Sequence, residues 1–99
     1  MATFITTIKF TEKGIQSIHD SPKRAAAFTA AAKKLGAKVV GLYWTLGPFD
    51  GVIVLEAPDD KVATAAMLSL ATKGNVQTTT ARAFNAAEIE KVIGILGKK

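Results

Sequence analysis

The stretch VVGLYWTLGPFDGVIVLE, residues 39–56, decides the fold that this sequence predicts. It holds two apolar runs of strand-forming residues, and between them lies the segment Gly-Pro-Phe-Asp-Gly at residues 47–51. Asp-Gly favours a tight reversal, proline presets one backbone dihedral and glycine tolerates positive φ, so the pattern indicates a β-hairpin. Residues 52–57 are apolar on both faces, and a strand of this kind needs cover on both sides.

A strand and a long helix are expected before the hairpin. Residues 3–10, TFITTIKF, alternate with the period of two that is typical of a strand. Thr11 is expected to cap a short helical excursion over residues 12–19. The Ser-Pro pair at residues 21–22 predicts the start of the long helix, with the serine hydroxyl as its cap, and Gly36 predicts its end.

A second helix, a last strand and a C-terminal helix are expected after the hairpin. Asp59 is the expected N-cap of the second helix, which ends near Gly74. Residues 76–84, VQTTTARAF, favour a strand because β-branched threonines prefer extended backbone. Asn85 and Glu88 have the spacing of a capping box, and an apolar helical stripe follows them.

The predicted order is strand, helix, strand, strand, helix, strand, helix. It corresponds to the split βαβ or ferredoxin-like arrangement, βαββαβ, with an added C-terminal helix. The sequence therefore predicts one α+β domain over residues 1–99 with a four-stranded antiparallel sheet. In this arrangement the first and third strands are central, and both long helices lie on one face of the sheet.

The other face of the sheet is left open by this arrangement. If the larger apolar residues of the two central strands face the helices, then Ile5, Val52 and Val54 lie on the open face. A large exposed apolar patch on a small protein usually marks an interaction surface, so we expect a two-fold homodimer with sheet packed against sheet. The alternative is that the C-terminal helix folds over the open face of its own chain and leaves the protein monomeric.

The composition is that of an ordinary globular domain, with 48% hydrophobic and 21% charged residues. No apolar run approaches the roughly 20 residues needed to cross a bilayer. The N-terminal residues alternate and do not form the basic and apolar blocks of a secretory signal. The sequence has no cysteine, which excludes disulfides, thiolate nucleophiles and Cys-ligated zinc. We expect a cytoplasmic protein.

The net charge of +5 comes from 13 basic and 8 acidic residues. Five of the basic residues gather near the first long helix: Lys23, Arg24, Lys33, Lys34 and Lys38. They are not interleaved with aromatic residues in a nucleic-acid-binding pattern, so we interpret them as a solvated helix face. Weak attraction for anions or nucleic acid is the alternative.

Motifs that carry chemistry are scarce in this sequence. His19 is the only histidine, and no metal-ligand spacing surrounds it. The serines have no nucleophile-elbow pattern, and glycine-rich phosphate loops are absent. The sequence therefore predicts no metal site and no cofactor, and it assigns no catalytic residue.

Four residues are candidates for the lining of a ligand pocket between the sheet and the helices. Trp44, Phe49 and Asp50 combine two aromatic rings with a carboxylate at the hairpin end, although a plain turn also explains this segment. Arg82 lies on the last strand, where its guanidinium can bind a carboxylate or phosphate. The alternative for Arg82 is exposure to solvent, or pairing with an acid such as Glu56.

Three separated blocks of this sequence resemble the GYD domain family of small bacterial proteins. The blocks are FITTIKFTEKGIQSIHDSPKRAAAF at residues 4–28, KKLGAKVVGLYWTLGPFDGVIVLEAPDD at residues 33–60 and GNVQTTTARAF at residues 74–84. The resemblance implies a ferredoxin-like fold of the dimeric α/β barrel type. It names no reaction, because the family has no firmly established activity.

The motif that gives the family its name corresponds here to Gly47, Phe49 and Asp50. The family typically has tyrosine where this sequence has Phe49. A phenylalanine ring can still pack, but it cannot act as an acid, a base or a hydrogen-bond donor. Asp50 is therefore the only protonatable side chain left in the turn.

From these observations we expect a homo-oligomeric small-molecule-binding or accessory domain, with a small anionic or aromatic ligand and no membrane partner. The first alternative is a cofactor-free enzyme of the isomerase or monooxygenase type, in which His19 or Asp50 moves a proton. The second alternative is a purely structural subunit whose partner is another protein. A thermal-shift screen against metabolites separates the binding hypothesis from the structural one.

Overall fold

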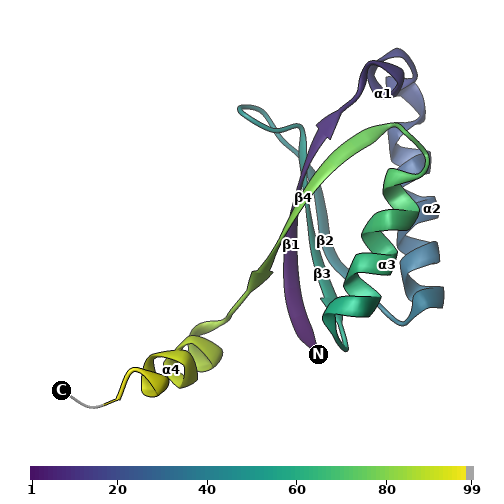
Figure 1. Ribbon diagram of the computed structural model, residues 1–99. Coiled ribbons are helices and arrows are strands. Elements are labelled where there is room, and N and C mark those ends of the chain that lie inside the picture. Colours follow the sequence, from purple (N-terminus) through teal and green to yellow (C-terminus); the bar gives the residue numbers. More distant parts are fainter. Residues whose placement is uncertain (98–99) are drawn as a thin grey trace.

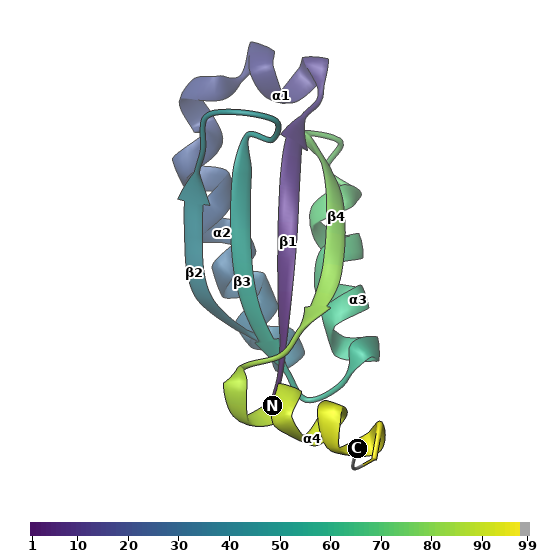
Figure 2. The same ribbon diagram turned by 90° about the vertical axis from the view of Figure 1, so that its left-hand side faces the viewer.

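The computed structural model describes residues 1–97 and contains one four-stranded antiparallel sheet. The strands are β1 (Ala2–Phe10), β2 (Lys38–Trp44), β3 (Gly51–Ala57) and β4 (Val76–Ala83). Their order across the sheet is β2-β3-β1-β4 (Figure 2). The two central strands are therefore the first and the third, as the sequence predicts.

Two long helices cover one face of the sheet (Figure 1). They are α2 (Ser21–Leu35) and α3 (Asp60–Ala71). The short helix α1 (Glu12–Gln16) and a 3-10 turn, η1 (Ile18–Asp20), connect β1 to α2. This arrangement confirms the predicted ferredoxin-like α+β fold.

Most of the predicted helix ends are confirmed by hydrogen bonds. The Thr11 hydroxyl accepts from the Gly14 N–H at 3.1 Å, and the Asp59 carboxylate accepts from the Val62 N–H at 2.9 Å. Gly36 ends α2 in the left-handed conformation, with φ of 95°, which glycine adopts without steric cost.

The prediction that Ser21 caps α2 is wrong. The N-cap position is Asp20, which makes no side-chain capping bond, and Ser21 is already the first residue of the helix. The Ser21 hydroxyl instead accepts a hydrogen bond from the indole of Trp44. A tertiary contact with β2 has taken the place of the local cap.

A bulge in β2 changes which of its residues face the helices. The pairing with β3 shifts between Val39 and Gly41, and Val40 is the extra residue of the bulge. Strict alternation predicts Val40 on the same face as Leu42, and this prediction is wrong. Val39 packs with Leu42 against the core, whereas Val40 is 54% exposed. The extra residue reverses the alternation of a strand.

The core lies between the sheet and the two long helices. Its central strands supply Phe4, Ile8, Ile53 and Leu55, all buried. The helices contribute small buried residues to the same layer: Ala32, Ala63 and Ala66. Small side chains let the helix backbones approach the sheet closely, which agrees with the alanine-rich stripes of the sequence.

The opposite face of the sheet is open in the single chain (Figure 2). Ile5 lies opposite Val54 on the neighbouring strand, and Thr7 lies opposite Val52. All of these residues alternate with the buried residues of the core, so they face away from the helices. This confirms the predicted apolar open face.

The C-terminal helix α4 (Ala86–Ile95) does not cover that face. It begins with the predicted capping box of Asn85 and Glu88, and then projects beyond the end of the sheet (Figure 1). None of its residues is buried. The alternative in which α4 folds over the sheet of its own chain is therefore wrong.

The helices in the described part of the chain are all too short or too polar to pass through a lipid bilayer.

Candidate functional site

A pocket of about 430 Å³ lies between the sheet and the helices, at the end of the sheet where the β2–β3 loop is found. Its volume falls in the range of roughly 300 to 1,000 Å³ that is typical of small-molecule sites. Strands and helices both contribute to its apolar wall, through Ile8, Phe28, Leu42, Ile53, Leu70 and Val76. The pocket therefore offers a cavity large enough for a small ligand.

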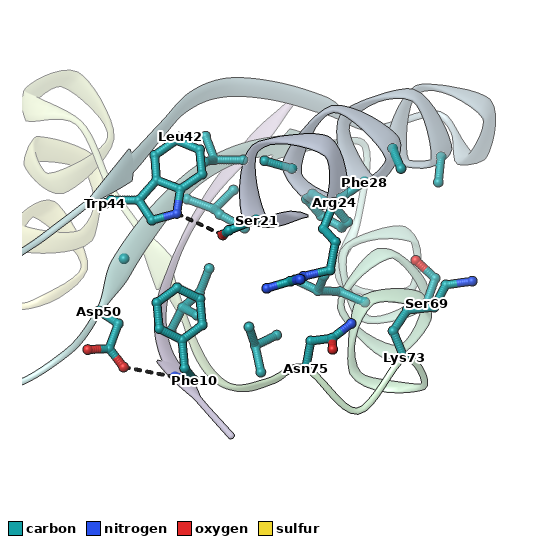
Figure 3. Close-up of a pocket in the computed structure, with 18 of the residues that line it drawn as sticks. Phe10, Ser21, Arg24, Phe28, Leu42, Trp44, Asp50, Ser69, Lys73 and Asn75 are labelled. Atoms are coloured by element: carbon teal, nitrogen blue, oxygen red, sulfur yellow. Dashed lines mark hydrogen bonds between the residues drawn. The ribbon is translucent and has the colours of Figure 1, made fainter. Parts of the chain in front are cut away.

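Trp44 and Ser21 form one side of this pocket (Figure 3). The indole Nε1–H of Trp44 donates to the buried Ser21 hydroxyl at 2.9 Å. Because Ser21 begins α2 and Trp44 ends β2, this bond holds the helix and the strand edge together. It also fixes the indole ring in one orientation at the pocket wall.

Arg24 projects from α2 toward the middle of the pocket (Figure 3). Its Nη1 donates to the Ser17 carbonyl at 2.7 Å and to the Ser17 hydroxyl at 3.2 Å, and its Nη2 donates to the Gly14 carbonyl at 3.3 Å. A guanidinium has five N–H donors. The N–H of Nε and one N–H of Nη2 have no acceptor within residues 1–97, so they can bind a ligand.

Asn75 contributes a second polar group to the pocket. Its backbone carbonyl accepts from the Thr11 N–H at 3.0 Å, and the residue is only 9% exposed. Its side-chain amide lines the pocket and makes no hydrogen bond to other residues in the described part of the chain (Figure 3). The amide atoms reach solvent, because no side-chain nitrogen or oxygen among residues 1–97 is both fully buried and without a partner, so the amide is open to water or to a ligand.

Asp50 anchors the β2–β3 loop to the end of β1. Its N–H donates to the Ile8 carbonyl at 2.7 Å, and its Oδ2 accepts from the Phe10 N–H at 2.8 Å. Asp50 also lines the pocket. Its second carboxylate oxygen, Oδ1, takes no part in the hydrogen bond to Phe10. The structure thus gives Asp50 a structural role at the site's edge, and a catalytic role for it remains a hypothesis.

The structure brings together two of the four residues predicted to line a pocket. Trp44 and Asp50 line it, whereas Phe49 and Arg82 are absent from its described walls. Phe49 lies in the loop, where its carbonyl accepts from the Thr45 hydroxyl at 2.7 Å. Arg82 borders a smaller hollow of about 280 Å³ between β4 and α3. Ligand binding by any of the four stays a prediction.

Arg82 pairs with the C-terminal helix and not with Glu56. Its Nη2 lies 3.4 Å from Oε2 of Glu88. The guanidinium carbon also lies 4.5 Å from the ring centroid of Phe84 and 5.7 Å from that of Phe4. Arg82 is on the helix-facing side of β4, opposite Phe4 of β1, and this placement directs it away from the open face.

The pKa of the Glu88 carboxyl is held below its usual value. The first cause is the backbone N–H of Asn85, which donates to Oε1 at 3.0 Å as one half of the capping box. The guanidinium of Arg82 acts in the same direction. Both groups favour the charged carboxylate at the start of α4.

His19 lies on η1, is exposed and does not border the pocket. The structure therefore does not place it with Asp50 as an acid–base pair at the pocket. Within residues 1–97 no group of three or more acidic, histidine or cysteine side chains could hold a metal ion.

Sequence reasoning missed most of the pocket lining, including the polar residues Ser21, Arg24 and Asn75. Arg24 was assigned to a solvated helix face, but only the four lysines of that set are exposed there. Its position four residues before buried Phe28 is a signal that could have found it, because such residues share one face of a helix. For Asn75 the sequence offers no such signal, since its burial depends on contact with α1.

The fold and the pocket define this chain as a ferredoxin-like α+β domain with a cavity of ligand size. The family model of the GYD domain matches residues 4–93, and the chain belongs to the GYD domain family. A relative from Thermus thermophilus is 36% identical over 90 residues, with 90% of this chain and 95% of the relative covered. That relative is named "glutamine synthetase and cystathionine beta-lyase binding protein".

Solved structures with the same fold include two regulators. One is a feast or famine regulatory protein from M. tuberculosis complexed with L-methionine, with a TM-score of 0.66 and 15% identity over 87% of this chain. The other is an AsnC family transcriptional regulator from Agrobacterium tumefaciens, with a TM-score of 0.57 and 18% identity over 85% of this chain. The match spans 52% of the first regulator and 50% of the second. Because the identities are low, the likeness shows the fold alone.

A third solved structure, also from Thermus thermophilus, is 28% identical with a TM-score of 0.51. The match covers 87% of this chain and 96% of that one. The fold thus occurs in a chain of nearly the same extent.

Proposed function

We propose that the protein is a small-molecule-binding accessory domain whose ligand occupies the pocket between the sheet and α2. The observation that carries this proposal is the cavity of about 430 Å³, in which Arg24 and Asn75 offer polar groups that residues 1–97 do not fully engage. Ligand pockets typically combine an apolar wall with a few such polar groups, and a bound ligand takes the place of the water that reaches them.

The ligand is a small organic acid with an apolar or aromatic body. Arg24 keeps two N–H donors free beside the amide of Asn75, and a carboxylate accepts from such donors with charge-assisted bonds. Lys73 also borders the pocket, but its side chain points outward, so Arg24 is the cation that faces the cavity (Figure 3). The apolar wall, including the Trp44 indole and Phe28, then buries the body of the ligand.

Two copies of the chain associate through the open faces of their sheets, and the assembly acts in the cytoplasm. The support is the apolar set Ile5, Val52 and Val54, which the register places on the face that the helices leave uncovered. Antiparallel sheets commonly pack face to face with such residues interdigitated. The pocket lies on the other side of the sheet, so association leaves it accessible.

The experiment is calorimetric titration of the full chain with small aromatic carboxylates, phenylacetate among them, each beside its neutral amide. We expect binding of the acid and little binding of the amide, because only the acid forms charge-assisted bonds. A thermal-shift measurement gives an independent readout, since a ligand at 100 times its Kd adds about 2.7 kcal/mol of stability.

Two variants connect the binding to the pocket. Asn75→Ala should weaken binding of the acid by about tenfold, which corresponds to the loss of one hydrogen bond to a charged group. Gln77→Ala, an exposed amide two residues along the same chain, should leave the affinity unchanged. Absence of binding for every acid and every amide would overturn the proposal.

A second candidate function is binding to an enzyme as a partner protein. The observation in its favour is the relative named for binding glutamine synthetase and cystathionine β-lyase, which is 36% identical over 90% of this chain. The test immobilises the chain and measures the capture of each purified enzyme. Saturable capture supports this function, and a signal no larger than that of an unrelated protein argues against it.

A further inference from the structure

The C-terminal helix α4 presents an apolar stripe that its own chain leaves uncovered. Positions 89, 92, 93 and 96 lie on one face of the helix and carry Ile, Val, Ile and Leu, all exposed. The opposite face carries the charged residues Glu90 and Lys91. This pattern is that of a helix which packs one face against a protein surface.

A helix of this length gains little stability from itself. It has 10 residues, and isolated helices shorter than about 12 to 15 residues are marginal in water. The capping box of Asn85 and Glu88 helps to begin the helix, but none of the residues in its remaining turns is buried against residues 1–97. Most helical stability in proteins comes from such packing.

Arg82 connects β4 with α4 through its guanidinium group. Its guanidinium donates to the carbonyls of Thr3 and Ala83, pairs with Glu88 and lies over the ring of Phe84. These contacts join the end of β4 to the first turn of α4. α4 itself lies beyond the end of the sheet, on the side of the open face and away from α2 and α3 (Figure 1).

The exposed area of the chain is larger than a folded monomer of its mass should have. The chain exposes 6796 Å², whereas a compact protein of 10.4 kDa exposes about 5,400 Å². The excess of roughly 1,400 Å² exceeds the area of about 800 Å² that each partner buries in a standard interface. The radius of gyration is 15.2 Å, against about 12.6 Å expected for 99 residues.

The open face has the character that suits a second copy. Its charged residues, Lys9, Lys38 and Glu56, lie toward the ends of the strands, while its central positions are apolar residues and threonines. Depletion of charge at the centre is typical of protein interfaces. A copy docked there would stand on the same side of the sheet as α4 (Figure 1).

We propose that α4 is an exchanged arm, which packs its apolar stripe on a second copy of this chain docked against the open face. The inference rests on the association of two copies proposed above and extends it. By two-fold symmetry each copy gives one arm and receives one. The sheet faces supply the centre of the interface, and the two arms enlarge it at the rim.

Two substitutions of the same type on the same helix test the arm. Ile93 lies on the apolar stripe and is 55% exposed in the single chain, whereas Ile95 lies off the stripe and is 86% exposed. Neither is buried, so Ile93→Glu and Ile95→Glu leave the core of each chain intact. We expect Ile93→Glu to weaken self-association at least about tenfold in sedimentation velocity, and Ile95→Glu to leave it unchanged.

Amide hydrogen exchange over a range of protein concentrations gives a second readout. The amides of α4 should become protected as the dimer forms, and Ile93→Glu should remove that protection. If both variants associate like the parent chain and α4 stays unprotected in the dimer, the proposal that α4 is an exchanged arm is wrong, while the proposed association stands. A monomeric mass at every concentration would overturn the association, and the arm with it.

Discussion

At the residue scale, the contact between Gly14 and Asn75 connects the short helix α1 to the wall of the pocket. A Cβ placed on Gly14 would lie 2.0 Å from the carbonyl oxygen of Asn75. The same turn receives a hydrogen bond from the Thr11 hydroxyl to the Gly74 carbonyl at 2.7 Å. Only glycine permits this approach, and the approach places the amide of Asn75 in the pocket.

Gly14→Ala should therefore destabilise the fold and weaken ligand binding together. Backbone atoms must move to admit the new methyl group, so we expect a loss of about 1 to 3 kcal/mol in the free energy of unfolding. Denaturant unfolding measures this loss, and calorimetry with the acid ligand measures the affinity.

Gly94→Ala is the matched control. Gly94 lies in α4, where an added Cβ meets no atom of the described chain within 4 Å. Alanine is the better helix former there by about 1 kcal/mol, so α4 gains helicity and the core is unchanged. Equal losses of stability in the two variants would contradict the proposed role of Gly14.

At the scale of elements, the distance between α2 and the sheet is set by small residues. Ala32 lies on the face of α2 that packs on the sheet and is completely buried, whereas Ala30 on the same helix faces solvent. The alanine-rich stripe in the sequence indicates such close packing, and the structure shows which of its members lie in the core. Larger side chains at those members would force the two layers apart.

Ala32→Leu should destabilise the protein by about 1 to 3 kcal/mol, because the core has no room for the added atoms. Ala30→Leu adds the same atoms on the exposed face and should change stability by less than about 0.5 kcal/mol. Both values come from denaturant unfolding curves. A tolerated Ala32→Leu would show that α2 can move outward at little cost.

The first turn of α4 should depend on pH through Glu88. The pKa of this carboxyl is lower in the folded helix than in the unfolded chain, chiefly because the Asn85 N–H donates to it. Its support of α4 is therefore complete above the unfolded pKa of about 4.3 and is lost as the pH falls through the lower folded value. Residue-resolved amide NMR shifts of Asn85 and Glu88 follow this loss.

Glu88→Gln removes the titration and should give shifts that stay nearly constant over the same acid range. Glu90→Gln changes an acid on the same helix outside the capping box, and it should leave the transition of the first turn in place. A transition that persists unchanged in Glu88→Gln would show that another group governs the first turn.

At the scale of the whole molecule, the two faces of the sheet carry the two proposed activities. The helix side holds the pocket, while the open side holds Ile5, Val52 and Val54. The pocket lies at the end of the sheet that carries the β2–β3 loop, and α4 lies beyond the other end (Figure 2). The proposed ligand site and the proposed self-association surface are therefore separate, and a variant should remove one without the other.

Self-association should make the unfolding midpoint of the protein depend on its concentration, because a partner that binds the folded state stabilises it. Val54→Lys places a charge at the centre of the open face and should abolish this dependence. Ala30→Lys adds the same residue on the exposed face of α2 and should retain it. Thermal unfolding at several concentrations measures the effect, and a concentration-independent midpoint for the parent chain would contradict the association.

Much of the fold follows from local patterns, and the exceptions have identifiable causes. Caps at Thr11, Asp59 and Asn85 depend on neighbouring residues, so the sequence predicts them correctly. The bulge at Val40 cannot be predicted from the sequence pattern, because the alternation of a strand gives no sign of an added residue. Ser21 does not act as a cap, and its hydroxyl instead accepts a hydrogen bond from the indole of Trp44, which is distant in sequence.

The sequence by itself determined the order of the elements, the apolar open face and the likeness to the GYD domain family. These features depend on periodicity and on residues close together in the chain. Only the tertiary structure decided that Arg24 and Asn75 share a pocket with Trp44, and that Arg82 pairs with Glu88 beside α4. The reason is physical: a side chain's partners across a fold depend on packing between elements far apart in sequence, which no local pattern encodes.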